Sequence, residues 1–289
     1  MFFMLGVSDT FDFCQCELCQ KAVEKYTQSG LSMQFANMVA DAVEAWRREN
    51  APERLIYLVT FAYRITFEAP VRKENDQYVP IDPSVVARDN VIIQFAPIDA
   101  NFWYPFMDAE HNSVSREALM GWMAVAKRFF VWDYRQDFND IIFPFPYQLN
   151  AQQNLETYAR IGVMEVFNQA QRFCPGSPFI DMDNFALARL HWNIKENYDA
   201  LCQQFRKAYY REAEPMVTQY LHQIHDFWKV LREERGHNGY LYWGPSRRPN
   251  ANRLEELDLF QQTLEQGMAA TQTIEDPALR KKVYKRVEV

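Results

Sequence analysis

The sequence predicts an α/β fold with a parallel sheet, followed by a helical C-terminal region. Five short runs of residues are almost wholly apolar, as expected of strands that are covered on both faces. Segments with apolar residues at helical spacing separate most of these runs, and strands that alternate with helices form parallel sheets. Polar residues, several of them carboxylates, follow the runs directly.

Each element follows from its local pattern. The expected strands cover residues 2–7, 55–63, 91–95, 129–132 and 162–167. Apolar residues from Leu31 to Trp46 recur at helical spacing between the first two strands, and Pro52 closes that segment. A long polar connection joins the second strand to the third. Residues 119–126 form the next expected helix, and residues 149–161 and 185–192 supply the helices on either side of the fifth strand.

The pattern changes after Trp192. Residues 198–210, 215–232 and 253–270 are expected to be helices, and a basic helix begins at residue 277. The second of these helices carries one apolar stripe, formed by Val217, Tyr220, Leu221, Ile224 and Trp228. Such a stripe is typical of packing against a neighbouring helix. We therefore expect two domains, a barrel-like domain over residues 1–195 and a helical appendage over residues 196–289.

Composition excludes several classes of function. The 289 residues are 48% hydrophobic and 15% aromatic, which suffices for a large core. Acidic residues outnumber basic ones by 38 to 31 and no basic run occurs, so we expect no nucleic-acid partner. No stretch approaches the roughly 18 apolar residues of a membrane span, and the first seven residues lack the features of a signal peptide. Oligomeric state stays open.

Polar residues gather at the predicted carboxyl ends of the strands, the edge where parallel sheets carry their sites. The residues at these ends are Ser8, Asp9, Tyr63, Arg64, Ile98, Asp99, Asp133, Tyr134, Asn168 and Gln169, and all except Ile98 are polar. A carboxylate here suits acid–base chemistry or contact with a sugar hydroxyl. Asp9 is a better candidate for this role than Asp12, which is more typical of a residue that caps a turn. Strand ends are also simply where the chain leaves the core.

Two further carboxylates lie among aromatic residues. Asp99 begins an aromatic loop that contains Trp103, and Asp133 lies between Trp132 and Tyr134. Paired carboxylates with aromatic rings that stack on a sugar are typical of glycoside hydrolysis. The alternative for Asp133 is a structural ion pair with Arg135 or Arg64. Glu165, inside the fifth strand, is either a buried, satisfied carboxylate or a catalytic one.

The tightest cluster of reactive residues is Cys14-x-Cys16-x-x-Cys19. Three thiolates at this spacing can share a zinc ion if a fourth ligand, such as Cys174, joins them. The alternative is a local disulfide or reduced thiols, and the odd total of five cysteines argues against a complete disulfide framework. We place no metal ligand and no cofactor in the predicted site. The chain also lacks HExxH, GxSxG and phosphate-loop motifs.

The run Asp9-x-x-x-Phe13-Cys14-x-Cys16-x-x-Cys19 resembles the D-G-x-G-Y-C-x-C-x-x-C motif of a bacterial domain of unknown function, DUF4838. Further stretches resemble the family in the same order, at residues 60–63, 98–102, 131–134, 143–146, 162–169 and 188–193. The resemblance covers most of residues 1–230. It implies a partial (β/α)8 TIM-type barrel, about strands 4 to 8, followed by C-terminal helices.

The same resemblance implies a function. The family is similar to carbohydrate-active (β/α)8 barrels, and its branch known as glycoside hydrolase family 163 implies an endo-β-N-acetylglucosaminidase acting on N-glycans. Such enzymes use the substrate's acetamido oxygen as nucleophile, with one carboxylate orienting it and another acting as acid. The chain would then be a fragment of a longer periplasmic or extracellular enzyme. Its partner would be a carbohydrate substrate.

Carried over by position, the resemblance makes Asp9 the carboxylate of the fourth strand and places Asp99 and Asp133 at other site-facing strand ends. We expect these three residues to be catalytic. The expected substrate-binding residues are Tyr63, Trp103, Trp132, Tyr134 and Asn168. Asn168 stands where the family often has glutamate, and Asp9 has no adjacent glutamate. The alternative function is therefore a non-catalytic carbohydrate-binding remnant of the family.

Overall fold

The computed structural model describes residues 1–6, 9–139, 145–170, 179–242 and 254–288. The chain divides into two compact units. The sheet unit comprises Met1–Ala100, Phe106–Asp133 and Tyr158–Asn168, and the helical unit comprises Asn101–Pro105, Tyr134–Thr157 and Gln169–Val289. The units interleave along the sequence, and the division expected near residue 195 stays a prediction.

The described strands of the main sheet follow the five apolar runs. They are β1 (Phe2–Leu5), β2 (Tyr57–Ala62), β5 (Val91–Phe95), β6 (Phe129–Tyr134) and β7 (Glu165–Gln169). They lie in the order β1-β2-β5-β6-β7, with parallel pairing from β1 to β6. The amide of Met164 donates to the carbonyl of Phe129 (2.9 Å) and that of Arg135 to Gln169 (2.8 Å), which continues the parallel order to β7.

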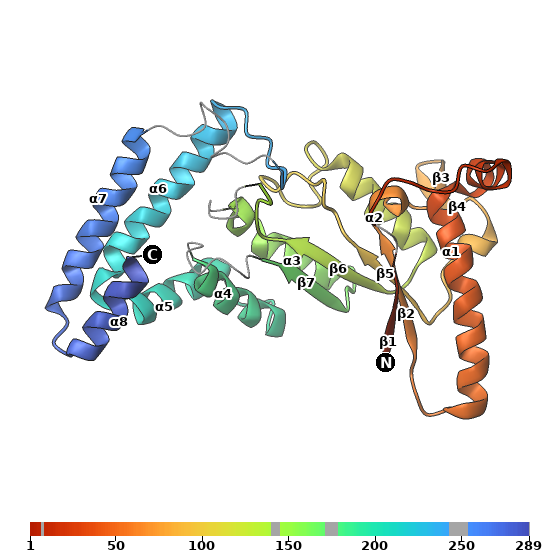
Figure 1. The fold of residues 1–289 in the computed structure, drawn as a ribbon, viewed down its shortest axis with the longest axis horizontal. Helices are drawn as coiled ribbons and strands as arrows, with labels where there is room; N and C mark the ends of the chain where they lie inside the picture. Colours follow the sequence, from red (N-terminus) through yellow and green to blue (C-terminus); the bar gives the residue numbers. More distant parts are fainter. Residues whose placement is uncertain (7–8, 140–144, 171–178, 243–253, 289) are drawn as a thin grey trace. The chain divides into compact units, whose positions relative to one another are not determined.

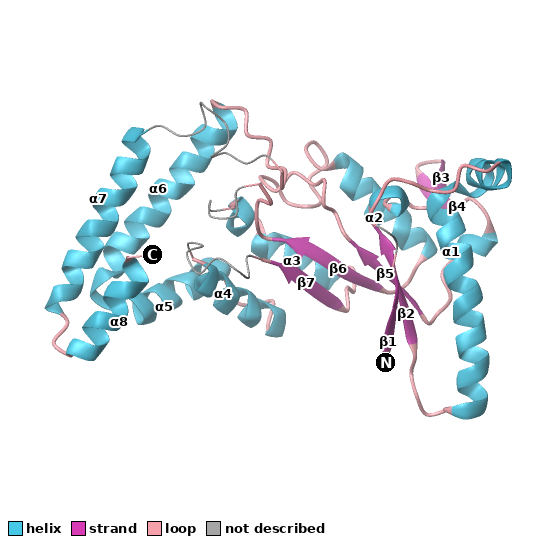
Figure 2. Ribbon diagram, in the orientation of Figure 1, coloured by secondary structure: helices cyan, strands magenta, loops and turns pink. Residues whose placement is uncertain are grey.

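The sheet curls into a parallel half barrel (Figure 2). The predicted α/β class and the C-terminal helices are thereby confirmed. The assignment to strands 4 to 8 of a TIM-type barrel stays a prediction. One face of the sheet carries a core cluster of Val59, Ile92 and Phe130, with Tyr57 packed against it.

Two helices that lie wholly within the sheet unit connect its strands (Figure 1). Helix α1 (Glu17–Asn50) joins β1 to β2, and α2 (Ser113–Val125) joins β5 to β6. Helix α1 is broken at Thr27, whose φ of 63° interrupts the helical backbone. The Thr27 hydroxyl accepts a hydrogen bond from the Gly30 amide (3.2 Å), so it caps the second helical segment. The apolar residues Met33, Ala36 and Ala40 of that segment are buried.

The predicted polar connection between β2 and β5 contains a hairpin. Strands β3 (Val71–Glu74) and β4 (Gln77–Pro80) pair antiparallel. Asn75 and Asp76 form its two-residue turn, with φ of 50° and 62°. Two successive residues with positive φ define a type I′ turn, for which asparagine and aspartate are favoured.

The helical unit contains the helices predicted at residues 198–210, 215–232, 253–270 and from residue 277, together with helices that were expected on either side of the fifth strand. It contains η3 (Pro146–Leu149), most of α3 (Ala151–Arg160), α4 (Ile180–Trp192), α5 (Tyr198–Tyr210), α6 (Glu214–Glu233), α7 (Leu254–Ala270) and α8 (Pro277–Val287). Residues Val217, Leu221, Ile224 and Trp228 of the predicted stripe are buried. None of the helices described is both long and apolar enough to cross a membrane.

Candidate functional site

The structure brings Asp9 and Tyr63 together at the carboxyl end of β2. The Tyr63 hydroxyl donates to Asp9 Oδ1 over 2.9 Å, and Arg64 Nε donates to the Tyr63 hydroxyl over 3.0 Å. Arg64 Nε also lies 3.6 Å from Asp9 Oδ1. The Asp9 side chain is 78% exposed, whereas that of Arg64 is 18% exposed. Asp9 therefore presents its carboxylate to solvent while its neighbours hold it in place.

Arg64 reaches this position through an unusual backbone conformation. Its φ is 51°, in the left-handed region that disfavours residues with a β-carbon. Arg64 begins the short helix η1 (Arg64–Thr66), and the Thr66 hydroxyl contacts the carbonyls of Phe61 (2.8 Å) and Tyr63 (3.0 Å). Such strained residues are concentrated at functional sites. The backbone thus supports the assignment of a site at this strand end.

Aromatic rings complete the group around Asp9. The Arg64 guanidinium lies 4.9 Å from the ring centre of Phe11 and 5.2 Å from that of Tyr63. Burial, together with the hydrogen bond to Asp9, raises the pKa of the Tyr63 hydroxyl above its usual value. Tyr63 therefore stays protonated at neutral pH and acts as a donor. We call Asp9, Phe11, Tyr63 and Arg64 the Asp9 cluster.

A row of aromatic side chains crosses the same face of the sheet. Ring centres lie 6.1 Å apart between Phe61 and Trp132 and 4.8 Å apart between Trp132 and Phe167. Tyr63 follows Phe61 by two residues in extended backbone, so both side chains face the same way. Trp132 is half-buried and Phe167 is exposed. We call Phe61, Trp132 and Phe167 the aromatic row.

Asp133 does not share the surface of the aromatic row. Adjacent residues of a strand point to opposite faces, so Asp133 lies on the other side of β6 from Trp132. Asp133 is 1% exposed, and its carboxylate accepts a hydrogen bond of 3.2 Å from the Tyr158 hydroxyl at the end of α3. The structure therefore separates Asp133 from the ring of Trp132, which precedes it in sequence.

The two remaining candidate carboxylates, Asp99 and Glu165, are exposed. Asp99 lies in the turn after β5, the strand next to β2. Glu165 opens β7 and, by alternation, shares the face of Phe167. The reading of Glu165 as a buried, satisfied carboxylate is wrong, because this residue is exposed. Asn168 is partly buried and lies on the opposite face of β7 from Phe167.

Trp103 and Tyr134 lie in the core of the helical unit. The Trp103 indole N–H points to His237, at 3.1 Å from Nδ1 and 3.2 Å from the carbonyl oxygen. Its ring is 4% exposed and packs edge-on against Trp228. Tyr134 is 3% exposed and contacts the rings of Phe102 and Phe138. Neither ring offers an open face for a ligand in this structure.

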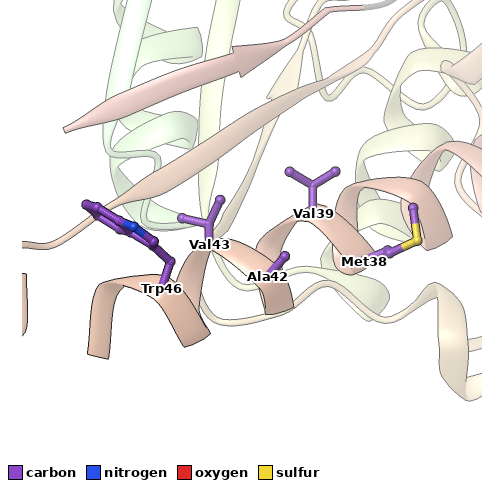
Figure 3. A pocket seen from close by; sticks show the side chains of 5 residues that line it. All are labelled: Met38, Val39, Ala42, Val43 and Trp46. Carbon is purple, nitrogen blue, oxygen red and sulfur yellow. The ribbon is translucent and has the colours of Figure 1, made fainter. Parts of the chain in front are cut away.

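Two further features lie outside the Asp9 cluster. The thiol sulfurs of Cys14, Cys16 and Cys19 all lie within 4.8 Å of one another, whereas Cys174 lies outside the described residues. A shallow groove of about 370 Å³ runs along α1 (Figure 3). Its lining consists of Met38, Val39, Ala42, Val43 and Trp46. Because none of these side chains is charged, the groove suits an apolar surface rather than a sugar.

The sequence predicted three of the four residues of the Asp9 cluster, but not the strained backbone of Arg64. Asp9, Tyr63 and Arg64 were all expected at strand ends, whereas neither the role of Phe11 nor the left-handed backbone of Arg64 was expected. Phe11 sits in the run next to Asp9, and the aromatic character of that run was its only signal.

Comparison with known proteins yields one relationship. No protein of curated function and no solved structure matches the chain. Residues 1–222 match the family described as a domain of unknown function, DUF4838. This match spans more than two thirds of the sequence and includes the Asp9 cluster, the aromatic row and the three clustered cysteines. The chain therefore belongs to the DUF4838 family.

Proposed function

We propose that this chain is a glycoside hydrolase-like protein of the family 163 type that acts on N-acetylglucosamine-containing glycans. One observation carries the proposal. A solvent-facing carboxylate, held by a tyrosine hydroxyl and an arginine, lies on the sheet face that carries the half-exposed aromatic row. A periplasmic or extracellular location, where such glycans occur, is part of the same proposal.

The two parts of the surface match the two kinds of surface on a sugar. The C–H-rich face of a pyranose ring packs on aromatic side chains such as Trp132 and Phe167, while its hydroxyl and acetamido groups need polar partners. Asp9 accepts hydrogen bonds from such groups. In the substrate-assisted scheme one carboxylate orients the acetamido group for attack, and we assign Asp9 to that role.

The scheme also requires a general acid. Of the two other predicted carboxylates, Asp99 is exposed at the end of β5, beside the strand that leads to Tyr63. Asp133 is buried against Tyr158. We therefore assign the acid role to Asp99 and a structural role to Asp133.

The second candidate function is non-catalytic carbohydrate binding. The burial of Asp133 favours it, because this carboxylate is removed from the face that carries Trp132. Asn168, which the family resemblance places where a glutamate is often found, favours it as well. In this case the aromatic row and Asp9 would bind the sugar without cleaving it.

The test combines turnover with binding. The chain is incubated with an N-glycan and with a chromogenic β-N-acetylglucosaminide, and sugar binding is measured by calorimetry. We expect turnover that falls at least 100-fold in Asp9→Asn, whereas Asp12→Asn keeps wild-type turnover. Asp12 is the matched control because it is an exposed neighbour whose partner is Thr10.

The outcomes separate the two candidates. Trp132→Ala should weaken binding in either case, because it removes the central ring of the aromatic row. Binding without turnover supports the non-catalytic function. A chain that neither binds nor cleaves these glycans contradicts the carbohydrate assignment altogether.

A further inference from the structure

The three cysteines that follow the Asp9 cluster form a compact group. Their thiol sulfurs lie within 4.8 Å of one another and are not joined by disulfide bonds. Cys14 and Cys16 are exposed, and Cys19 is partly buried. Among the described residues, no other set of three histidine, cysteine or acidic side chains gathers as closely. This convergence needs an explanation that the proposed sugar site does not supply.

Local backbone geometry accounts for the convergence. Cys16 is the N-cap of α1, with extended φ and ψ of −67° and 155°. The Gln20 amide donates to its carbonyl over 3.0 Å, so the first turn of the helix is formed. Cys19 occupies the third helical position, one turn onward, which an N-cap side chain reaches directly. Cys14 precedes Cys16 by two residues, the spacing that places side chains of an extended segment on one side.

We propose that Cys14, Cys16 and Cys19 bind one Zn²⁺ ion through their three thiolates. A zinc–sulfur bond of about 2.3 Å in tetrahedral geometry places sulfur atoms about 3.8 Å apart. The sulfurs here need to approach one another by about 1 Å at most to reach that spacing. This shift requires only side-chain rotation on an exposed loop and a helix terminus.

The chemistry of the donors selects the metal. Thiolates are soft ligands that favour zinc, copper(I) or iron–sulfur clusters. Iron–sulfur clusters are held by four protein ligands, and the described residues bring three together. Cys14 and Cys16 are exposed to solvent, so a water molecule completes a tetrahedral zinc site. The positive end of the α1 dipole also favours the negative charge of three thiolates.

Binding is a balanced exchange of protons for metal. Three thiols each release one proton to solvent, and Zn²⁺ with one water becomes bound to three thiolates, leaving a net charge of −1 on the complex. No oxidation or reduction occurs. The ion ties the loop that carries Asp9 and Phe11 to the first turn of α1. Its role is therefore to stiffen this loop, whatever ligand the loop contacts.

Metal content tests the proposal directly. The chain is purified under reducing conditions without chelator and without an affinity metal, and its metals are counted by mass spectrometry. We expect about one zinc per chain, and Co²⁺ substitution should produce the intense near-ultraviolet absorption of sulfur-to-cobalt charge transfer. Cys16→Ser and Cys19→Ser should each lower zinc affinity at least 10-fold.

Cys202→Ala is the matched control, because Cys202 is buried in α5 and takes no part in the cluster. This variant should keep the full zinc content. Circular dichroism of each variant verifies that it is folded. Less than about half an equivalent of zinc in the wild-type chain overturns the proposal, as does recovery of copper in place of zinc. A disulfide between two of the three cysteines in the reduced preparation overturns it as well.

Discussion

The left-handed backbone of Arg64 would suit a glycine, yet its guanidinium contacts Tyr63, Asp9 and the ring of Phe11. A left-handed conformation costs a residue with a β-carbon about 1 kcal/mol or more relative to glycine. The chain thus accepts a local cost in stability to place a charge beside Asp9. This trade between stability and side-chain placement is typical of binding and catalytic sites.

Two substitutions of Arg64 distinguish the effect of backbone strain on stability from the effect of losing the guanidinium. Arg64→Gly and Arg64→Ala both remove the guanidinium, but only glycine relieves the strain. We expect Arg64→Gly to be more stable than Arg64→Ala by about 1 kcal/mol. Urea unfolding followed by circular dichroism measures this difference. Equal stability of the two variants would show that the turn after β2 is not strained.

A buried polar network in the helical unit makes a second prediction at this scale. Asp183 of α4 accepts hydrogen bonds from the Tyr198 hydroxyl (2.7 Å) and from Gln148 Nε2 (3.0 Å). Burial nevertheless raises the pKa of Asp183 to about 6. His225 of α6 stacks on Trp228, and burial, with a smaller effect of His222, lowers its pKa to about 4.

These two shifts act on stability in opposite directions. Between pH 4 and 6 the folded chain keeps a proton on Asp183 that the unfolded chain, with a pKa near 3.8, releases. Stability from this group therefore falls as pH rises through that window. His225 is neutral in the folded chain down to about pH 4, whereas the unfolded histidine is protonated below 6.5. Its contribution therefore rises with pH over nearly the same window.

Asp183→Asn should remove the opposing effect of Asp183, so that the contribution of His225 to the pH dependence of stability becomes measurable. We expect the unfolding free energy of this variant to rise more steeply from pH 4 to 6.5 than that of the wild-type chain, by up to about 3 kcal/mol. His225→Gln should change the slope in the opposite sense. Urea unfolding at four pH values measures both slopes, with the exposed Asp258→Asn as the control. Profiles that run parallel to wild type would contradict the assigned burial costs.

At the scale of elements, hydrophobic periodicity predicted the amphipathic helices but not the polar start of α1 or the short strands β3 and β4. Residues 198–210 were expected to be helical and form α5 with the same bounds. Helix α1 begins at Glu17, well before the apolar repeat that predicted it. The periodicity did not indicate this start, because the first turns of the helix are polar and carry no apolar stripe. The sequence pattern did not predict the hairpin of β3 and β4, because strands of four residues are too short to show a clear alternation. Its signal was the pair Asn75-Asp76.

The candidate site shows the same limit. The position of Asp9 and Tyr63 at neighbouring strand ends was predictable, because parallel strands end at one edge of a sheet. The face of the sheet on which Asp133 lies could not be predicted from the sequence. In a strand as apolar as β6, no alternation of polar and apolar residues indicates which side chains face the helices. Only the register between β5 and β6 and the contact with Tyr158 reveal it.

Packing of α2 against the hairpin yields a prediction of its own. A β-carbon on Gly121 would lie 3.0 Å from Ala69 Cβ and 3.1 Å from Val71 Cγ2. Alanine is favoured over glycine in a helix by about 1 kcal/mol, but both neighbours are held close to the backbone and have little room to move. We expect Gly121→Ala to destabilise the chain by about 1–3 kcal/mol through overpacking.

Thermal unfolding of Gly121→Ala measures this effect. Met123→Ala, an exposed position on the same helix, is the control and should change stability little. A Gly121→Ala variant more stable than wild type would mean that helix propensity outweighs the close contact. The hairpin would then be loosely attached to α2.

At the scale of the whole molecule, apolar side chains are exposed at one end of the sheet. Strand β1 ends the described strand order, and Phe2, Phe3 and Met4 are 51%, 48% and 53% exposed. Successive residues point to opposite faces, so β1 exposes apolar surface on both sides. The apolar groove of α1 adds the exposed Met38 and Trp46. Edge strands and apolar patches of this kind are sites of association.

We therefore expect the chain to self-associate as its concentration rises. Phe3→Lys and Trp46→Lys place a charge on β1 and on the groove, respectively, and should each shift the distribution toward monomer. Sedimentation velocity over a 100-fold range of concentration measures the shift. Leu257→Lys on α7 is the matched control, since Leu257 is as exposed as Phe3 but lies on neither surface. A wild-type chain that stays monomeric throughout would contradict this prediction. If Leu257→Lys restores the monomer as well as Phe3→Lys, net charge rather than the apolar edge governs association.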